Sequence, residues 1–142
     1  MDMIEDVIVE QLRNDGTIAG ILSTYNGDPA VFSETAPEDV DRDGPYMVVV
    51  VRVFPAPDYV IDQFDIFVHY FQRGTSRAKA REVSFRVEAI FDPNTFQNDV
   101  YADIRFYRRH GDFLPEPDPL EIHYVKQLSA RGSRKKWMQQ LP

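Results

Sequence analysis

The chain has 142 residues, no cysteine and a formal net charge of −7 at pH 7. A chain of this length forms one domain and buries roughly 70% of its unfolded surface without covalent staples. The lack of cysteine excludes a disulfide framework and thiolate metal sites. No apolar run approaches the roughly 20 residues that span a bilayer, and the acidic N-terminus is unlike a signal peptide, so we expect a soluble, intracellular protein.

Charge is distributed unevenly along the chain. Residues 1–71 hold fourteen acidic and three basic side chains, a net charge of −11, whereas residues 72–142 hold nine acidic and thirteen basic side chains, a net charge of +4. Opposite charges on one small domain attract neighbouring copies if folding keeps the two halves apart. If the halves interleave in the fold, the asymmetry disappears. The sequence leaves both arrangements open.

The first third of the chain reads as helix followed by turns. Residues 2–14 have an apolar stripe that includes Ile8 and Leu12, which predicts an amphipathic helix. A short helical turn over 17–23 and an edge strand over 30–33 are expected next, on either side of a turn at Asn26–Pro29.

Two β-rich runs, residues 46–54 and 59–71, form the scaffold of the predicted fold. They are rich in valine and aromatic residues and are separated by the turn-forming segment 55–58, which predicts an antiparallel hairpin. Both runs carry apolar residues at even and odd positions. Such strands lie in the middle of a sheet with both faces covered.

The second half of the chain predicts a helix, a hairpin and a basic tail. The helix is expected over 75–91, with Thr75 as its N-cap. A strand follows over 100–109, then a proline-rich loop over 110–119 and a strand over 120–128. In the first of these strands alternation places one set of side chains on a core and the other in water or a polar interface. The core set is Val100, Ala102, Ile104 and Phe106, and the outer set is Tyr101, Asp103, Arg105, Tyr107 and Arg109.

These elements predict an α+β fold, with an antiparallel sheet of about four to five strands and two helices packed on one face. The domain is expected to span 1–128, and the basic segment 129–142 is expected to be flexible or ordered only by a partner. Two helices leave the other face of the sheet exposed, with side chains such as Val48, Phe54, Ile61 and Phe67. Such a face predicts self-association, unless the second hairpin folds over it.

The sequence contains no catalytic signature, so we expect no enzyme activity and no cofactor. The three histidines, His69, His110 and His123, lack metal-ligand spacing and are expected to be one structural and two surface residues. The segment Asp39-x-Asp41-x-Asp43-Gly44 copies the first half of a calcium loop. Val50 occupies the position of the bidentate glutamate, so a solvated turn is favoured over a metal site.

Basic residues allow a nucleic-acid-binding alternative. Arg131, Arg134, Lys135 and Lys136 lie beside Trp137, a combination that can contact phosphate and stack a base. Further basic residues occur in the helix over 75–91, interspersed with glutamate. The overall acidity counts against this alternative, and partner contact or disorder is favoured for the tail.

Taken together, the chain resembles the tail terminator, or tail completion, proteins of tailed bacteriophages and prophages. The likeness lies in the N-terminal MIEDVIVEQL, in ETAPEDVDRDG running into PYMVVVV, in QFDIFVHYF, and in the helix TSRAKAREVSFRVEAIF with its closing aromatic- and arginine-rich hairpin. It covers most of residues 1–128. Two alternatives remain open, namely another neck component, such as a head-completion or connector-adaptor protein, and a small nucleic-acid-binding protein.

The resemblance implies a structural virion protein of the tail or neck, made in the host bacterial cytoplasm and not bound to membranes. Family members form a homo-hexameric ring that caps the tail tube, stops its polymerisation and contacts the head connector or stopper, while DNA passes through the lumen without specific binding. A head-to-tail ring needs two complementary patches on each copy. The interface candidates are Glu38, Asp39, Asp41, Asp43, Phe67, Arg105, Arg109, Arg134, Lys135, Lys136 and Trp137, of which the four acidic residues are candidates for the lumen.

Overall fold

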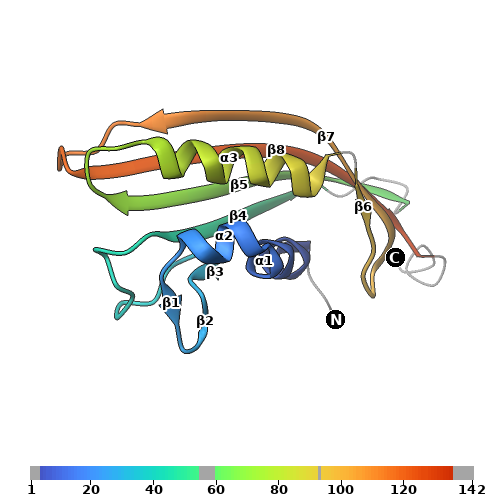
Figure 1. Cartoon of the computed structure of the whole chain (residues 1–142). Helices are drawn as coiled ribbons and strands as arrows, with labels where there is room; N and C mark the ends of the chain where they lie inside the picture. The colour runs from blue at the N-terminus through green and yellow to red at the C-terminus, as the bar shows by residue number, and fades with distance from the viewer. Residues whose placement is uncertain (1–3, 55–59, 93, 136–142) are drawn as a thin grey trace.

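The structure is a computed structural model that describes residues 4–54, 60–92 and 94–135. The described residues form three helices, a six-stranded sheet and a separate two-stranded hairpin (Figure 1). The element bounds are α1 Ile4–Asn14, α2 Gly16–Ile21, β1 Thr24–Tyr25, β2 Asp28–Pro29, β3 Val31–Ser33, β4 Tyr46–Phe54, β5 Ile61–Arg73, α3 Ala78–Phe91, β6 Thr95–Phe96, β7 Tyr101–Leu114 and β8 Glu121–Arg134.

The two β-rich runs form the predicted hairpin at the centre of the sheet. β4 pairs antiparallel with β5 from Tyr46–Phe71 to Phe54–Gln63. β8 pairs with the other edge of β5 from Ile61–Ser133 to Arg73–Glu121. β5 is therefore paired on both sides from Gln63 to Phe71, as its two-sided apolar sequence predicts.

The α+β class is confirmed, with more elements than the sequence predicted. The strand order is β3-β4-β5-β8-β7-β6, and only the β3–β4 pair is parallel. β3 and β6 are the two short edge strands. The additional helix is α2. It begins directly after α1, because Asp15 caps its N-terminus by accepting a hydrogen bond from Ile18 N at 3.0 Å. In the described part of the chain no helix is long and apolar enough to cross a membrane.

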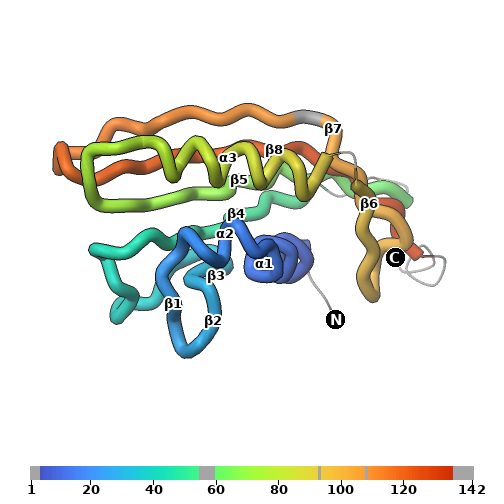
Figure 2. The backbone as a smooth tube through the Cα atoms, in the orientation of Figure 1, coloured from blue at the N-terminus to red at the C-terminus, as the bar shows by residue number. Residues whose placement is uncertain are grey.

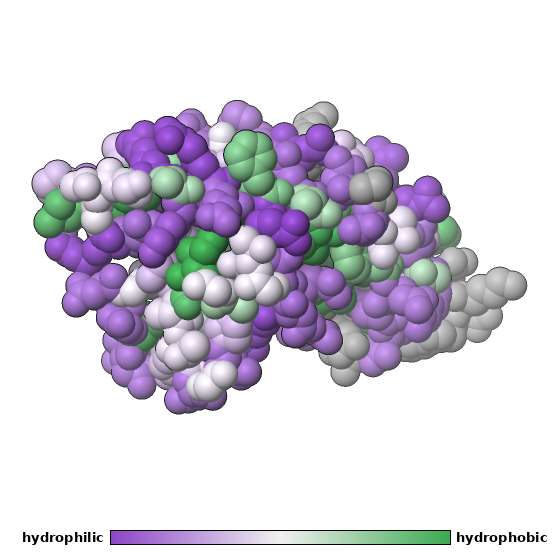
Figure 3. Space-filling model, in the orientation of Figure 1, coloured by the Kyte–Doolittle hydropathy of each residue, from purple (hydrophilic) through white to green (hydrophobic). Residues whose placement is uncertain are grey.

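All three helices cover one face of the sheet and form the main core with it. α1 packs on β3 and β4, and α3 packs near β7. The fully buried side chains on this face include Ile8 and Leu12 from α1, Val83, Val87 and Phe91 from α3, and Phe64, Ile66, Val68 and Tyr70 from β5. The outer surface on the helix side is mostly hydrophilic (Figure 3).

The two halves of the chain do not interleave in the sheet. β3, β4 and β5 come from residues 31–73 and lie on one side, whereas β8, β7 and β6 come from residues 95–134 and lie on the other. Figure 2 shows this division, with the blue and teal chain below and α3, β7 and most of β8 above. The acidic half of the sequence therefore keeps to one flank, whereas residues 95–134 on the other flank hold six acidic and six basic side chains and carry no net charge.

Two β-bulges change the predicted alternation of residues 100–109 at Tyr101, Ala102 and Arg109, whereas Val100, Ile104 and Phe106 face the core as predicted. The register between β7 and β8 shifts between Tyr101 and Asp103, and again between Phe106 and Arg108. Each extra residue reverses the faces of the side chains beyond it. Tyr101 is therefore buried in the core and Ala102 is exposed. The second shift brings Arg109 onto the helix face, where it pairs with Glu88 and Asp92 of α3.

Three predicted boundaries are also wrong. α3 begins at Ala78, three residues after Thr75, and Ser76 Oγ accepts the hydrogen bond of Ala78 N at 3.3 Å. β7 continues to Leu114, which shortens the proline-rich loop. β8 continues to Arg134, because the long β5 supplies backbone partners to residues 129–133. Of the predicted flexible tail, residues 129–134 are thus strand, and residues 136–142 lie outside the described residues.

Glycine at position 132 of β8 is required by a close contact. A Cβ atom there would lie 2.7 Å from Cδ1 of Tyr101 and 3.0 Å from Cε2 of Phe64, whose rings pack edge to face. Both rings are buried in the core and cannot turn away freely.

We expect Gly132→Ala to lower the free energy of unfolding by about 1–3 kcal/mol, because the added methyl group overpacks the core. Urea unfolding measures the change. The matched control is Gly20→Ala in α2, where a Cβ atom meets nothing within 4 Å. The control is expected to raise stability by up to about 1 kcal/mol. Equal stability of the Gly132→Ala and native proteins would contradict the close contact.

Candidate interaction surface

Within the described residues, the sheet face opposite the helices is covered at one end only. Residues 34–45, here called the acidic loop, bury Val40 against this face together with Phe32, Tyr46 and Val48 in a second apolar cluster. The predicted exposure of Val48 is therefore wrong, since its exposed fraction is 8%. Phe54 and Ile61, at the other end of the sheet, are exposed as predicted, at 52% and 42%.

Aromatic side chains stack in a column beside the acidic loop. The Phe71 ring lies between Tyr46 and His123, with centroid distances of 5.0 and 4.2 Å. His69 Nδ1 is 2.8 Å from His123 Nε2, and His123 Nδ1 is 2.6 Å from Glu116 Oε1. The neutral tautomers that fit these contacts have His69 donating to His123 and His123 donating to Glu116.

This column lines an open hollow of about 390 Å³ between the acidic loop and the sheet. The prediction that His123 is a surface residue is wrong, because its side chain is only 11% exposed. Burial, with a smaller contribution from the neighbouring His123, lowers the pKa of His69. Among the described residues, no group of three or more histidine, aspartate or glutamate side chains is placed to hold a metal ion.

The carboxylates of the half calcium motif have separate protein partners. Asp39 Oδ1 accepts a hydrogen bond from the Tyr25 hydroxyl at 2.7 Å, and Asp41 Oδ1 accepts one from Asp43 N at 3.0 Å. Asp43 Oδ1 lies 3.4 Å from the Arg73 guanidinium. Glu38, the fourth acidic candidate, is exposed on the same loop. The loop is thus an ordered acidic projection.

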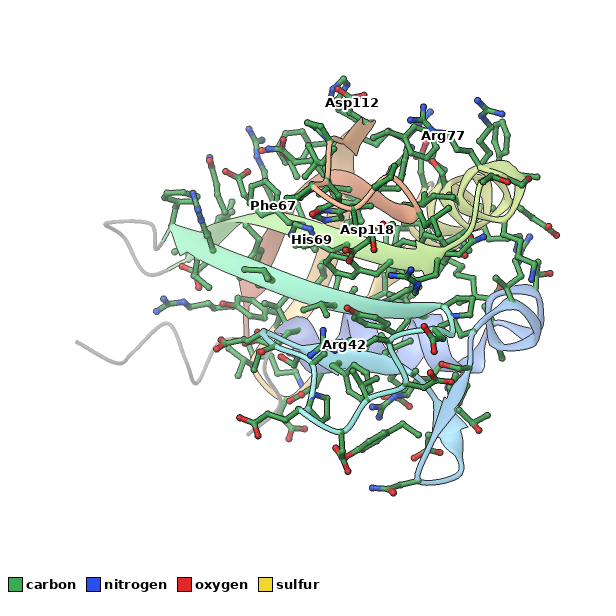
Figure 4. All side chains as sticks on the ribbon, turned by 90° about the vertical axis from the view of Figure 1, so that its left-hand side faces the viewer. Arg42, Phe67, His69, Arg77, Asp112 and Asp118 are labelled. Atoms are coloured by element: carbon green, nitrogen blue, oxygen red, sulfur yellow. The ribbon has the colours of Figure 1, made fainter. Side chains whose placement is uncertain are left out.

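Arg73 joins the acidic loop to the tip between β7 and β8. Its guanidinium donates to Asp118 Oδ2 at 2.7 Å as well as facing Asp43. Two hydrogen bonds lower the pKa of Asp118. The larger effect comes from the backbone N–H of Leu120 and the smaller from the Arg73 guanidinium. Figure 4 faces this end of the sheet, with Asp118 and Arg42 labelled on the two sides of β4. The acidic loop and the hairpin tip therefore form one end of the molecule.

At the other end of the same face lies a hollow of about 440 Å³, here called the arginine hollow. It is lined by Ile61, Asp103, Arg105, Tyr107, Arg131 and Ser133, from β5, β7 and β8. The Arg131 guanidinium lies 4.9 Å from the centre of the Tyr107 ring, a cation–π contact. Arg105 donates to Asp103 at 2.7 Å and keeps a 72% exposed side chain.

The predicted interface residue Phe67 lies between these two ends. Its ring is half-buried on the face away from the helices. The Arg52 guanidinium lies over this ring, 5.4 Å from its centroid, in a cation–π contact. Phe67 and Arg105 are thus both on the accessible sheet face, as an interface requires.

Arg134, by contrast, is an internal residue. Its guanidinium donates two hydrogen bonds to Asp62, at 2.9 and 3.0 Å, and Tyr101 donates a third at 2.6 Å. The Asp62 side chain is 1% exposed and that of Arg134 is 15% exposed. Burial and the hydrogen bond to Asp62 raise the pKa of Tyr101. This ion pair removes Arg134 from the predicted basic cluster.

The other basic candidates are separated from one another. Arg109 is bound to α3 on the helix face and is not available to a partner on the open face. Lys135 is half-buried, and its backbone N–H donates to Val100 O at 2.9 Å. Lys136 and Trp137 lie outside the described residues. The described residues therefore do not bring the predicted interface set together as one patch.

Lys126 is a buried polar residue that the sequence did not reveal. It occupies a core position of β8, only 4% exposed, and its ammonium group pairs with Glu88 of α3. Its Nζ also lies 3.2 Å from Ser84 Oγ. The ammonium group is held by a carboxylate beneath a helix, so this serine–lysine contact fits a structural role. The even spacing from Ile122 and Tyr124 was the signal that could have identified it.

Comparison with known proteins supports this fold. The sequence matches no protein-family model and no curated protein. One similar chain belongs to the solved structure of the virion of a native gene transfer agent particle. The alignment covers 92% of this chain and 94% of that chain, with a TM-score of 0.68 and 16% identity. A second solved chain aligns over 93% of this chain and 97% of its own length, with a TM-score of 0.64 and 13% identity. At these identities the likeness shows a shared fold.

We expect the stability of the protein to fall as the pH falls below about 6.5, the ordinary pKa of histidine. The folded state lowers the pKa of His69, so the unfolded state binds more protons in this range, and stability rises with pH and levels off above it. Urea unfolding at about pH 5 and about pH 7.5 measures this slope. His69→Gln is expected to reduce the slope, whereas His110→Gln, at an exposed position, is expected to retain it. An unchanged slope in His69→Gln would contradict the assignment.

Breaking the buried ion pair should cost far more than removing an exposed arginine from the same strand. We expect Arg134→Met to lower the free energy of unfolding by about 3 kcal/mol, because it leaves the Asp62 carboxylate buried without its cation. Arg131→Met, which loses only a contact with Tyr107, is expected to cost less than about 1 kcal/mol. Chemical denaturation measures the free energy of unfolding of both variants. Equal losses in Arg134→Met and Arg131→Met would contradict a buried ion pair between Arg134 and Asp62.

Proposed function

We propose that this protein is a structural component of a tailed phage or phage-like virion, and that it acts without enzymatic chemistry. The observation that carries the proposal is the fold likeness to a chain of a gene transfer agent virion, which extends over 92% of this chain and 94% of that one. The resemblance of the sequence to phage tail terminators supports the same role independently.

More specifically, the proposed role is that of a tail terminator. Copies of the chain form a homo-hexameric ring that caps the tail tube, stops its polymerisation and contacts the head connector or stopper protein. DNA passes through the ring without specific binding. The acidic loop at one end of the sheet and the arginine hollow at the other support a ring, because each copy then carries two different, complementary surfaces.

The nucleic-acid-binding alternative loses support from the position of the basic residues. Arg134 is bound to Asp62 in the interior and Arg109 is bound to α3. A phosphate contact is best made by an accessible lysine or arginine without a carboxylate partner, so the buried Arg134 and the paired Arg109 are weak candidates for it. The remaining alternative, another component of the neck, differs from the terminator in the partner that it binds.

The proposal predicts that the purified protein stops the growth of tail tubes. The tail-tube protein of the same particle is allowed to polymerise with and without the chain, and tube lengths are measured by electron microscopy. Shorter tubes with a ring at one end are the expected result. Rings that bind the portal but not the tubes would favour another neck component. Unaltered tubes, together with steeply salt-dependent retention on DNA, would reject both virion roles.

A further inference from the structure

We propose that the arginine hollow of one copy receives the acidic loop of the next copy, so that these two surfaces form the contact between neighbours in the assembly. The inference rests on the proposed function, which requires self-association, and it names the surfaces involved. It assigns the acidic loop to the contact between copies, whereas the sequence made its carboxylates candidates for the lumen.

The arginine hollow has the chemistry to bind carboxylates. Arg105 and Arg131 line it together with one carboxylate, Asp103, and Arg105 is largely exposed. Guanidinium groups bind carboxylates through two parallel hydrogen bonds, which favours aspartate and glutamate side chains as occupants. Arg131 is held over the Tyr107 ring, so its position is set before a partner arrives.

The hollow also has an apolar part that suits a protein partner. Ile61 and Tyr107 line it with exposed fractions of 42% and 50%. Exposed aromatic and aliphatic side chains beside arginine are typical of the centre of protein interfaces. A free anion would use only the arginine residues, whereas a folded loop contacts both kinds of side chain.

The acidic loop is a suitable occupant because it is both charged and ordered. Glu38, Asp39 and Asp41 are exposed on it, and Val40 anchors it to the sheet with an exposed fraction of 5%. The Tyr25 hydroxyl and Arg73 hold two of its carboxylates in place. An ordered loop loses little conformational entropy on docking, which favours association. Its aliphatic neighbours Ala36 and Pro37 are half-buried and offer apolar surface as well.

The two surfaces lie too far apart in one copy to meet, so they must pair between copies. The acidic loop leads into the first residue of β4, at the end of the sheet where Tyr46 pairs with Phe71. The arginine hollow lies at the opposite end, where Ile61 pairs with Ser133, and includes β7 and β8 of the other flank. Figure 1 shows these ends at the left and the right of the sheet. Contacts between different patches repeat from copy to copy and close into a ring when the rotation allows.

The test uses reversal of charge at each surface. Glu38→Lys with Asp41→Lys places two lysines on the acidic loop and cancels its net negative charge, and Arg105→Glu with Arg131→Glu makes the arginine hollow acidic. Self-association of the full chain is measured by native mass spectrometry and sedimentation velocity at low and moderate salt. Each double variant alone is expected to associate at least tenfold more weakly than the native protein, because like charges then face each other.

Mixing the two double variants is the decisive measurement. Every contact between the two variants joins either the native loop to the native hollow or the two introduced lysines to the two introduced glutamates, so association is expected to return to within a few-fold of the native level, with the two variants alternating. The mixture also controls for folding, since an unfolded variant cannot restore assembly. The matched control, Glu10→Lys with Glu82→Lys, changes the net charge by the same amount at exposed helix positions and should associate like the native protein.

Three results would overturn the inference: a native protein that stays monomeric at all concentrations, double variants that associate like the native protein, or a mixture that fails to associate. The tube assay separates rejection of the contact between loop and hollow from rejection of the proposed function. Native protein that stops tube growth while the variants associate normally would reject only the named contact. Charge-dependent association without any effect on tubes would retain the contact and reject the terminator role.

Discussion

The strand β5 has to be buried on two chemically different faces while it supplies backbone partners to strands on both of its edges. On the helix face, Phe64, Ile66 and Val68 pack beneath α1 and α3. On the other face, His69 and Phe71 pack beside the acidic loop. A shift of one residue in its register would exchange these two sets, so the pairing with β4 and β8 fixes the position of every other layer. The acidic loop, the histidine column and the arginine hollow all take their places from this strand.

Local sequence pattern was sufficient to predict the parts of the fold that depend on local preference. The valine and aromatic runs of β4 and β5 and the apolar stripe of α1 were identified because burial imposes a regular spacing on them. The faces of Tyr101 and Arg109 were not predicted, because a β-bulge adds one residue without a fixed sequence signature. The covering of Val48 was missed because a polar, acidic loop gave no sign that Val40 would anchor it.

The candidate site was harder to predict than the fold, because its residues depend on partners far away in the chain. Arg134 reads as a surface base until Asp62, seventy-two residues earlier, is placed beside it. Lys126 reads as an exposed residue until Glu88 of α3 covers it. A buried charge is tolerated only with a partner that offsets its desolvation, and the identity of that partner is a property of the tertiary fold. Arg105, whose partner Asp103 lies only two residues away on the same strand, was correctly assigned to the accessible face.

The outer edge of the sheet is a place where strands of other molecules could add to this one. Within the described residues β6 pairs with β7 only at Arg105 and Ile104, so the edge from Phe106 to Leu114 has no neighbouring strand. A long free edge ordinarily recruits strands from other molecules and seeds aggregates. Here the bulge at Phe106 interrupts the regular spacing of backbone groups, and His110 and Asp112 add polar side chains beyond it. The sheet is thereby protected from growing sideways.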